Sequence, residues 1–340
     1  MNTKYWMISN RNESRRVRIG RRGDNVLGGR VSDDLTYWVA DSGPLDTLKS
    51  RTKTSLREFK KDLAGQADSF PLIRDLEDHE RQKHVTLFIH GYNNGWEDAA
   101  RRYEQLCRDL FESEGGMGVC VLFTWPSNGM TSGYYPDRRD ARRSADHLAE
   151  VLNNLYDYLV RKQDETDEAK RCRAKTSIIA HSMGNYVLEE AMRHCWNHNN
   201  RPLLVSLVNQ LIMVAADVDN DLFRGGEHSD GSGGDAIAQL TYRVTSLYTG
   251  RDQVLGMSAG FKHFGKRRLG RSGLDCRYDV PDNVWHIDCS DLIPRGERNI
   301  HSAYFEAKEV LQLMKQLLRG IDRRELERNR TNPTLRGSAS

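Results

Sequence analysis

The segment Thr176-Ser177-Ile178-Ile179-Ala180-His181-Ser182-Met183-Gly184-Asn185 decides the fold. It begins with a short β-branched and apolar run, which is typical of a buried strand, and a helical pattern follows Ser182. A serine on such a turn is held in a strained backbone conformation, so the residues two before and two after it must be small. Ala180 and Gly184 satisfy this requirement. The segment predicts a nucleophilic Ser182, although an ordinary strand-to-helix turn also fits a match this short.

The length of 340 residues suits one large α/β domain or two modest ones. Strands and helices alternate from about residue 84 onward, which favours a single domain over residues 1–320. Within it, residues 1–83 are predicted to supply N-terminal edge strands, at 5–9, 17–19 and 35–40, and a connector. The charged and polar residues 321–340 predict a disordered tail.

Charge and composition exclude several classes of protein. Lys and Arg number 51 against 48 Asp and Glu, so a net charge of +3 gives no long-range field to recruit nucleic acid. The first ten residues hold too short an apolar run for a signal peptide, and no stretch approaches the ~18 apolar residues that cross a bilayer. The six cysteines show no C-x-x-C spacing. Together these features predict a soluble, cytoplasmic protein without a nucleic-acid partner, and a small-molecule substrate is expected only from the motifs described next.

Apolar runs at 84–89, 119–124, 207–216, 241–248 and 284–289 predict further strands. Amphipathic patterns between them, such as the one from about residue 97 to 111, predict helices. The expected fold is α/β, with a mostly parallel central sheet, antiparallel N-terminal edge strands and helices on both faces. In such a sheet, functional residues gather beyond the carboxyl ends of the strands.

Four groups follow predicted strand ends or precede the last helix: Gly91-Tyr92, Ser182-Met183, Asp252 and His301. The order serine, aspartate, histidine is the order of nucleophile, acid and base in α/β-hydrolases. Ser182 would attack, His301 would take and return its proton, and Asp252 would orient the imidazole. The backbone N–H groups of Met183 and Tyr92 would bind the developing oxyanion.

Each role has competitors. His263 and His286 also follow the acid, but His263 lies in a basic loop and His286 alternates within a strand, so His301 is preferred. Asp217 is the alternative acid, because this fold can supply the carboxylate from the preceding strand. An aspartate directly after a strand more commonly binds the backbone of its own turn.

No cofactor and no metal is predicted. Asp217, Asp219 and Asp221 resemble the start of a calcium loop, but Leu222 and His228 stand where glycine and glutamate belong. His194 and His198 are one helical turn apart without a third evident ligand. The basic run at 262–271 could attract an acidic substrate or partner, but such a run is more often solvated, and this is the interpretation preferred. The loops 224–235 and 256–283 follow strands that border the site, so either could act as a lid.

The chain resembles the α/β-hydrolase superfamily, and within it an uncharacterised, mainly bacterial branch of serine-esterase-like proteins with a domain of unknown function. The resemblance covers about residues 80–320. It rests on 90–94 (HGYNN), 123–127 (FTWPS) with Tyr135 and Asp137 beyond it, 180–185 (AHSMGN), 216–219 (ADVD) and 301–305 (HSAYF). It implies the hydrolase fold and an esterase-type activity, and it implies no particular substrate.

Three functions remain open on the sequence. The first is a serine hydrolase that cleaves a carboxylic ester, or a thioester or amide, through an acyl-enzyme. The second is a binding or scaffold protein that keeps the fold without turnover. The third is an acyltransferase with the same triad, which differs only in the acceptor. The sequence does not indicate an oligomeric state.

Overall fold

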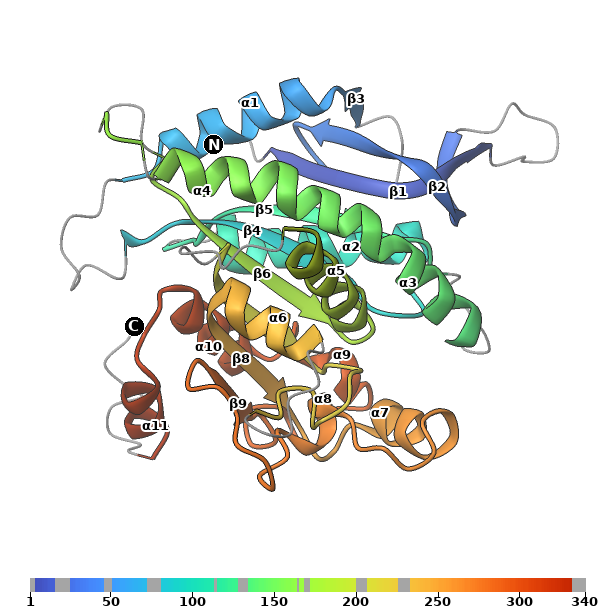
Figure 1. The fold of residues 1–340 in the computed structure, drawn as a ribbon, viewed down its shortest axis with the longest axis vertical. Helices are drawn as coiled ribbons and strands as arrows, with labels where there is room; N and C mark the ends of the chain where they lie inside the picture. The colour runs from blue at the N-terminus through green and yellow to red at the C-terminus, as the bar shows by residue number, and fades with distance from the viewer. Residues whose placement is uncertain are drawn as a thin grey trace.

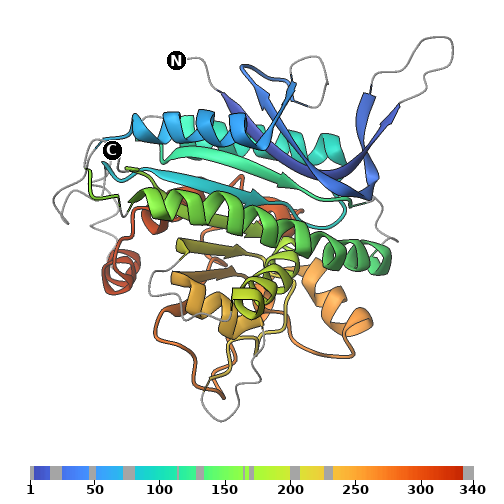
Figure 2. The ribbon, with the colours of Figure 1, turned by 45° about the horizontal axis from the view of Figure 1, so that its top comes forward.

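The computed structural model of the chain describes residues 4–15, 25–45, 51–71, 81–112, 115–127, 134–163, 165–167, 172–199, 207–225 and 233–331. A single nine-stranded sheet runs through this part of the chain in the order β3-β2-β1-β5-β4-β6-β7-β8-β9. Helices pack on both of its faces (Figures 1 and 2). The strand predicted at 17–19 lies outside the described residues.

The seven strands from β1 to β9 in the order given above are parallel to one another. The N-terminal edge is antiparallel, because β2 pairs in that sense with both β1 and β3. This confirms the predicted fold class. The strands are β1 (Tyr5–Arg15), β2 (Asn25–Ala40), β3 (Thr52–Thr54), β4 (His84–Ile89), β5 (Gly118–Thr124), β6 (Lys175–His181), β7 (Val208–Val214), β8 (Thr241–Tyr248) and β9 (Val284–Asp288).

The central strands are buried on both faces, which explains why they appear as continuous apolar runs rather than alternating ones. All six residues of β4 are buried, and so is β6 after Lys175. Their parallel register aligns Ile89 with Ala180, so the two strands end side by side. The loop after β4 and the turn after β6 therefore meet at the same edge of the sheet.

Two apolar cores lie on opposite sides of the sheet. One includes side chains of α1, α3, α4, α5 and α6, and the other includes side chains of α2, α10 and α11. The helices are α1 (Leu56–Asp68), α2 (Trp96–Leu106), η3 (Cys107–Glu112), α3 (Tyr134–Val151), η4 (Leu152–Tyr156), α4 (Asp157–Gln163), α5 (Gly184–Asn199), α6 (Gly233–Leu240), α7 (Gln253–Met257), η6 (Ser258–Lys262), α8 (Leu269–Ser272), α9 (Ile300–Ala303), α10 (Lys308–Leu318) and α11 (Arg323–Thr331).

Two sequence predictions about irregular segments are wrong in part. The predicted disordered tail contains helix α11, because Leu326, only 2% exposed, packs into the core on that side of the sheet. The predicted loop 224–235 ends early, because α6 begins at Gly233 and buries Ile237. Residues 226–232 and 332–340 lie outside the described residues.

Candidate functional site

Ser182 occupies a tight turn between β6 and α5. Its backbone has φ of 52°, a left-handed conformation that costs a non-glycine residue energy and needs support from its surroundings. The Ser182 N–H donates to the Val214 carbonyl at 2.9 Å, and Asn185 Nδ2 donates to the Ser182 carbonyl at 3.1 Å. A Cβ on Gly184 would lie 2.6 Å from the His90 carbonyl oxygen, so only glycine fits there.

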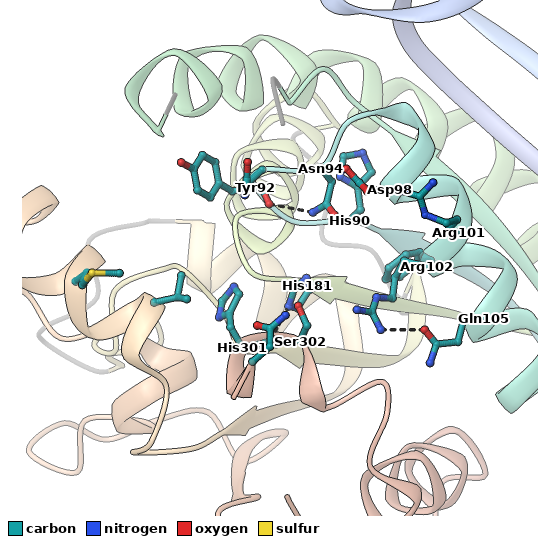
Figure 3. Close-up of a pocket in the computed structure, with 15 residues that line it drawn as sticks. His90, Tyr92, Asn94, Asp98, Arg101, Arg102, Gln105, His181, His301 and Ser302 are labelled. Carbon is teal, nitrogen blue, oxygen red and sulfur yellow. Dashed lines mark hydrogen bonds and ion pairs between the residues drawn. The ribbon is translucent and has the colours of Figure 1, made fainter. Parts of the chain in front are cut away.

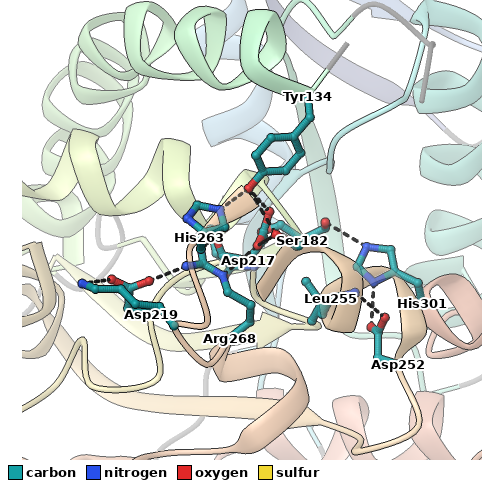
Figure 4. Close-up of polar contacts among 12 residues, drawn as sticks. Tyr134, Ser182, Asp217, Asp219, Asp252, Leu255, His263, Arg268 and His301 are labelled. Carbon is teal, nitrogen blue, oxygen red and sulfur yellow. Dashed lines mark hydrogen bonds and ion pairs between the residues drawn. The ribbon is translucent and has the colours of Figure 1, made fainter. Parts of the chain in front are cut away.

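A chain of two hydrogen bonds links the three predicted side chains, as Figure 4 shows. Ser182 Oγ lies 2.8 Å from His301 Nε2, and His301 Nδ1 lies 2.7 Å from Asp252 Oδ2. A carboxylate can only accept, so Nδ1 carries the proton toward Asp252. Nε2 of the neutral imidazole is then an acceptor for the Ser182 hydroxyl.

Asp252 is fixed by its own helix. It follows β8 and is the N-cap of α7, where its second oxygen, Oδ1, accepts from the Leu255 N–H at 3.0 Å. Capping satisfies a free N–H of the helix and orients the carboxylate. Asp252 is fully buried, and the side chain of His301, on the short helix α9, is 12% exposed. The pair is therefore shielded from water while His301 still reaches the surface.

The backbone of His301 is held by a second histidine. Nε2 of His181 lies 3.0 Å from the His301 carbonyl oxygen, and the two rings are 5.0 Å apart. Burial and the neighbouring His301 lower the pKa of His181 well below its usual value. His181 is thus a neutral donor that positions His301, a part of the site that the sequence analysis did not recognise.

The loop after β4 lies directly against the turn that contains Ser182. An added Cβ at Gly91 would lie 2.7 Å from Ser182 Cβ, so only a glycine lets the loop come this close. Tyr92 follows Gly91 in this loop, and Met183 follows Ser182 in the turn directly before α5. The two predicted oxyanion donors thus belong to segments in contact with each other, and their role remains a prediction.

A buried arginine anchors that loop. Arg11 of β1 donates from Nε to Thr124 Oγ1 at 2.9 Å and from Nη2 to the Asn94 carbonyl at 3.0 Å. His90 Nε2 also contacts Thr124 Oγ1, at 3.1 Å, and Asn94 Nδ2 donates to the Tyr92 carbonyl at 2.9 Å. The sequence analysis missed Arg11, because its run of N-terminal arginines gives no local signal that one of them is buried.

The alternative acid, Asp217, belongs to a different network on the other side of Ser182 (Figure 4). Its Oδ1 accepts from Arg268 Nε at 2.8 Å and from Ser258 Oγ at 2.9 Å, and its Oδ2 accepts from Tyr134 Oη at 2.8 Å. Burial raises the pKa of Asp217, but Arg268 and these hydrogen bonds more than offset it, so the pKa is lowered. His301 is not among these partners.

The competing histidines also lie elsewhere. His263 Nε2 is 2.5 Å from Tyr134 Oη, and burial lowers the pKa of His263 to about 4. His286 Nδ1 accepts from the Leu274 N–H at 2.7 Å on strand β9. Neither ring is a partner of Ser182 Oγ in the described part of the chain.

The basic run at 262–271 is not uniformly solvated, so this prediction is wrong at Arg268. The Arg268 side chain is fully buried and pairs with both Asp217 and Asp219, while Lys266 remains largely exposed. Residues in this segment are thereby tied to the loop after β7. Nothing local distinguishes Arg268 from its basic neighbours, since its burial depends on aspartates about 50 positions earlier.

No group of three or more potential metal ligands occurs among the described residues. His194 Nδ1 instead lies 2.5 Å from Asp146 Oδ1. In the same part of the chain, every helix is too short or too polar to cross a membrane.

A pocket of about 590 Å³ opens beside His301 (Figure 3). Its wall includes the loop after β4, the exposed side of α2 and residues of α7 and α9. The lining residues are Phe88, His90, Tyr92, Asn93, Asn94, Asp98, Arg101, Arg102, Gln105, His181, Val254, Met257, Asn299, His301 and Ser302. Most of them are polar or charged.

Known proteins resemble this chain at two levels. The uncharacterised protein alr1448 of Nostoc sp. is 27% identical over 144 residues, which is 36% of this chain and 34% of that protein, so the match spans about a third of the relative. Among solved structures, lipase B of Aspergillus fumigatus is 11% identical with a TM-score of 0.40, covering 73% of this chain and 55% of the lipase. An esterase of Pyrobaculum calidifontis is 12% identical with a TM-score of 0.33, covering 78% and 91%.

The family comparison covers most of the chain. The model of the family described as alpha/beta hydrolase of unknown function (DUF900) matches residues 67–319, a range that contains β4 to β9 and every residue of the pocket. The match agrees with the observed parallel sheet and with the resemblance stated from the sequence. The chain therefore belongs to the DUF900 family of α/β hydrolases.

Proposed function

We propose that this protein is a serine hydrolase that cleaves a carboxylic ester through an acyl-enzyme, with Ser182, His301 and Asp252 as its triad. The observation that carries the proposal is the continuous pair of hydrogen bonds, 2.8 Å and 2.7 Å long, that joins the three side chains. The strained backbone of Ser182 supports it, because such strain is common where a side chain must be presented to a substrate.

In the first half of the reaction, Ser182 Oγ attacks the ester carbonyl carbon while its proton moves to His301 Nε2. Asp252 stabilises the imidazolium that forms, and it keeps Nδ1 as the protonated nitrogen. The backbone N–H groups of Met183 and Tyr92 would donate to the tetrahedral oxyanion. His301 then returns the proton to the departing alkoxide as the C–O bond of the ester breaks.

In the second half, His301 removes a proton from water, which attacks the acyl-enzyme carbonyl. Collapse of the second tetrahedral intermediate breaks the bond to Ser182 Oγ, which takes the proton back from His301. The net change is addition of water across the ester, giving an acid and an alcohol. His301 Nε2 takes part in all four proton transfers, and the first and the last are exchanged with Ser182 Oγ, which lies 2.8 Å away.

A fluorophosphonate probe, which phosphonylates activated serines, tests the nucleophile. We expect the wild-type chain to be labelled and to hydrolyse 4-nitrophenyl esters of short acids, and Ser182→Ala to lose both properties. The matched control is Ser69→Ala, which alters an exposed serine at the end of α1, far from β6 in the sequence. This control should label like the wild type, whereas labelling that survives in Ser182→Ala would contradict the proposal.

A further inference from the structure

The wall of the pocket formed by α2 carries a guanidinium whose position is already fixed. Arg102 Nη1 donates to Gln105 Oε1 at 3.0 Å, and the guanidinium lies 5.3 Å from the centre of the Phe305 ring. Gln105 is itself held, because its Nε2 donates to the Phe305 carbonyl at 3.0 Å. The Arg102 side chain is 22% exposed, so it is mostly buried and still reaches the pocket.

Its carboxylate partner binds it weakly. Both Nη atoms of Arg102 share one oxygen of Glu306 at 3.4 Å, whereas a charge-assisted bond from nitrogen to a carboxylate is ~2.7–2.9 Å long. The Glu306 side chain is 51% exposed, so another anion can easily replace it as the partner of Arg102. By contrast, Arg101 Nη2 lies 2.5 Å from Asp98 Oδ1, so these two lining charges offset each other.

The charged residues that line the pocket are Asp98, Arg101 and Arg102, all on α2, and their charges sum to +1. Glu306 does not line the pocket and offsets this charge only through its 3.4 Å contact with Arg102. Arg102 is close enough to the centre of the site for its charge to help lower the pKa of His181, although burial and His301 contribute more. Figure 3 shows Arg101, Arg102 and Gln105 together to the right of His301, and Tyr92 above it.

The part of the lining contributed by α7 is different. Val254 and Met257 line the pocket with exposed apolar side chains, 38% and 56% exposed, just after the Asp252 that binds His301. An apolar group of a substrate can pack there. The pocket therefore combines an apolar part and a basic part with His301 as a shared lining residue.

We propose, on the basis of the serine hydrolase proposed above, that the substrate is an ester bearing an anionic oxygen group, a carboxylate or a phosphate, which binds Arg102. The planar fork of arginine suits two oxygens of either group. The anion would replace Glu306 at Nη1 and Nη2, and the scissile carbonyl would lie at Ser182. Arg102 is thus a specificity-determining residue that takes no part in the bond changes.

Matched esters test this assignment. The first pair, mono-4-nitrophenyl glutarate and 4-nitrophenyl pentanoate, has acyl chains of the same length and differs by the terminal carboxylate of the glutarate. The second pair, 4-acetoxybenzoate and phenyl acetate, has the same acyl group and differs by a carboxylate on the leaving group. Phenyl phosphate, as an inhibitor of pentanoate ester hydrolysis, tests phosphate. In Arg102→Gln, we expect kcat/KM to fall about 10- to 100-fold for at least one of the two anionic esters if the substrate carries a carboxylate. If it carries a phosphate, we expect the inhibition constant of phenyl phosphate to rise by the same factor. The neutral esters should change less than about threefold.

Two further variants separate charge from structure. Arg102→Lys keeps the charge without the fork and should recover part of the selectivity. Arg108→Gln removes a 67% exposed arginine from the adjoining η3 segment and should leave all rates unchanged. The inference would be overturned if Arg102→Gln lowered kcat/KM equally for the anionic and the neutral esters and left inhibition by phenyl phosphate unchanged.

The inference and the proposed function fail in different ways. If the wild type cleaves none of the esters, anionic or neutral, and is not labelled by the fluorophosphonate probe, the hydrolase proposal fails. Calorimetric binding of benzoate and phenyl phosphate to Ser182→Ala, with and without Arg102→Gln, still measures the anion site directly. Binding lost with Arg102 would support the site, and binding of neither anion to Ser182→Ala would refute it.

Discussion

Two separate hydrogen-bond networks lie beside Ser182, and each is built around a buried aspartate. Asp252 shares its oxygens between His301 and a helix N-terminus, while Asp217 faces the buried guanidinium of Arg268. The sequence favoured Asp252 and left Asp217 as the alternative acid, because both follow predicted strands, Asp217 at once and Asp252 after three further residues. The hydrogen bond of Asp252 with His301 and the pairing of Asp217 with Arg268 join residues far apart in the sequence, so the order of residues along the chain contains no information on them.

The two aspartates should therefore respond differently to loss of charge. We expect Asp252→Asn to lower kcat about 10³- to 10⁴-fold with little change in KM, because the imidazolium loses its partner. Asp217→Asn should instead lower the free energy of unfolding by about 3–5 kcal/mol, since it leaves the Arg268 charge buried without full compensation. Steady-state kinetics and urea unfolding of both variants measure this. A reversed pattern would reassign the acid to Asp217.

Gly184, two residues after Ser182, gives a second test at this scale. Gly184→Ala would place a methyl 2.6–2.7 Å from the carbonyl oxygens of His90 and Ile89, so the turn and the loop after β4 must separate. We expect unfolding free energy to fall by roughly 1–3 kcal/mol and probe labelling to be lost. Gly65→Ala is the matched control, because no atom lies within 4 Å of the added Cβ. In helix α1 this control should stabilise by about 0.5–1 kcal/mol, and thermal melting compares the two variants.

Among the elements, the strands were the most predictable and the segments held by distant contacts the least. The apolar runs of β4 and β8 predicted their bounds correctly, because both strands lie in the interior of the sheet, where β4 is buried along its whole length and β8 over its central residues. Helix α11 escaped prediction, because its one buried apolar residue, Leu326, lies in a strongly charged segment. The pocket was not predicted either, because it combines residues of α2, α7 and α9 that only the folded chain brings together.

Strand β1 also contributes to the site through Arg11. Arg11→Met would remove donors from Thr124 and the Asn94 carbonyl while keeping much of the side-chain volume. We expect a loss of about 2–4 kcal/mol in unfolding free energy and a lower kcat, because the loop that bears Tyr92 loses its anchor. Lys53→Met, which breaks a half-exposed ion pair with Glu13 at the same edge of the sheet, should cost less than about 1 kcal/mol and leave kcat unchanged. Activity unaffected in Arg11→Met would show that the loop does not depend on β1.

For the whole molecule, burial of histidines couples stability to pH. Burial lowers the pKa of His84 and His90 to about 3 and that of His263 to about 4, so these rings stay neutral in the folded chain. In the unfolded chain they take up protons near pH 6.5. Stability should therefore fall as the pH drops from about 6.5 toward 4, by up to ~1.4 kcal/mol per pH unit for each ring. The pKa of Glu189 is raised to about 7 mainly by burial, so protonation of Glu189 favours the folded chain as the pH falls. This offsets the loss of stability caused by about one of the three histidines.

Urea unfolding at pH 7, 6 and 5 checks this expectation. The variant His263→Gln should have a shallower dependence than the wild type, by about one histidine, because glutamine does not titrate. Unfolding free energies that are independent of pH over this range would show that the folded and unfolded chains bind the same number of protons.

The position of β1 in the sheet also constrains how the chain folds. Trp6 pairs with Val121, so more than a hundred residues must be synthesised after β1 before its second neighbour in the sheet exists. Until then, the hairpin of β1 and β2 exposes an unpaired edge of backbone donors and acceptors, which invites association with other chains. Contacts of such long sequence separation slow folding. Completion of β5 therefore closes the period during synthesis in which this chain is most vulnerable to aggregation.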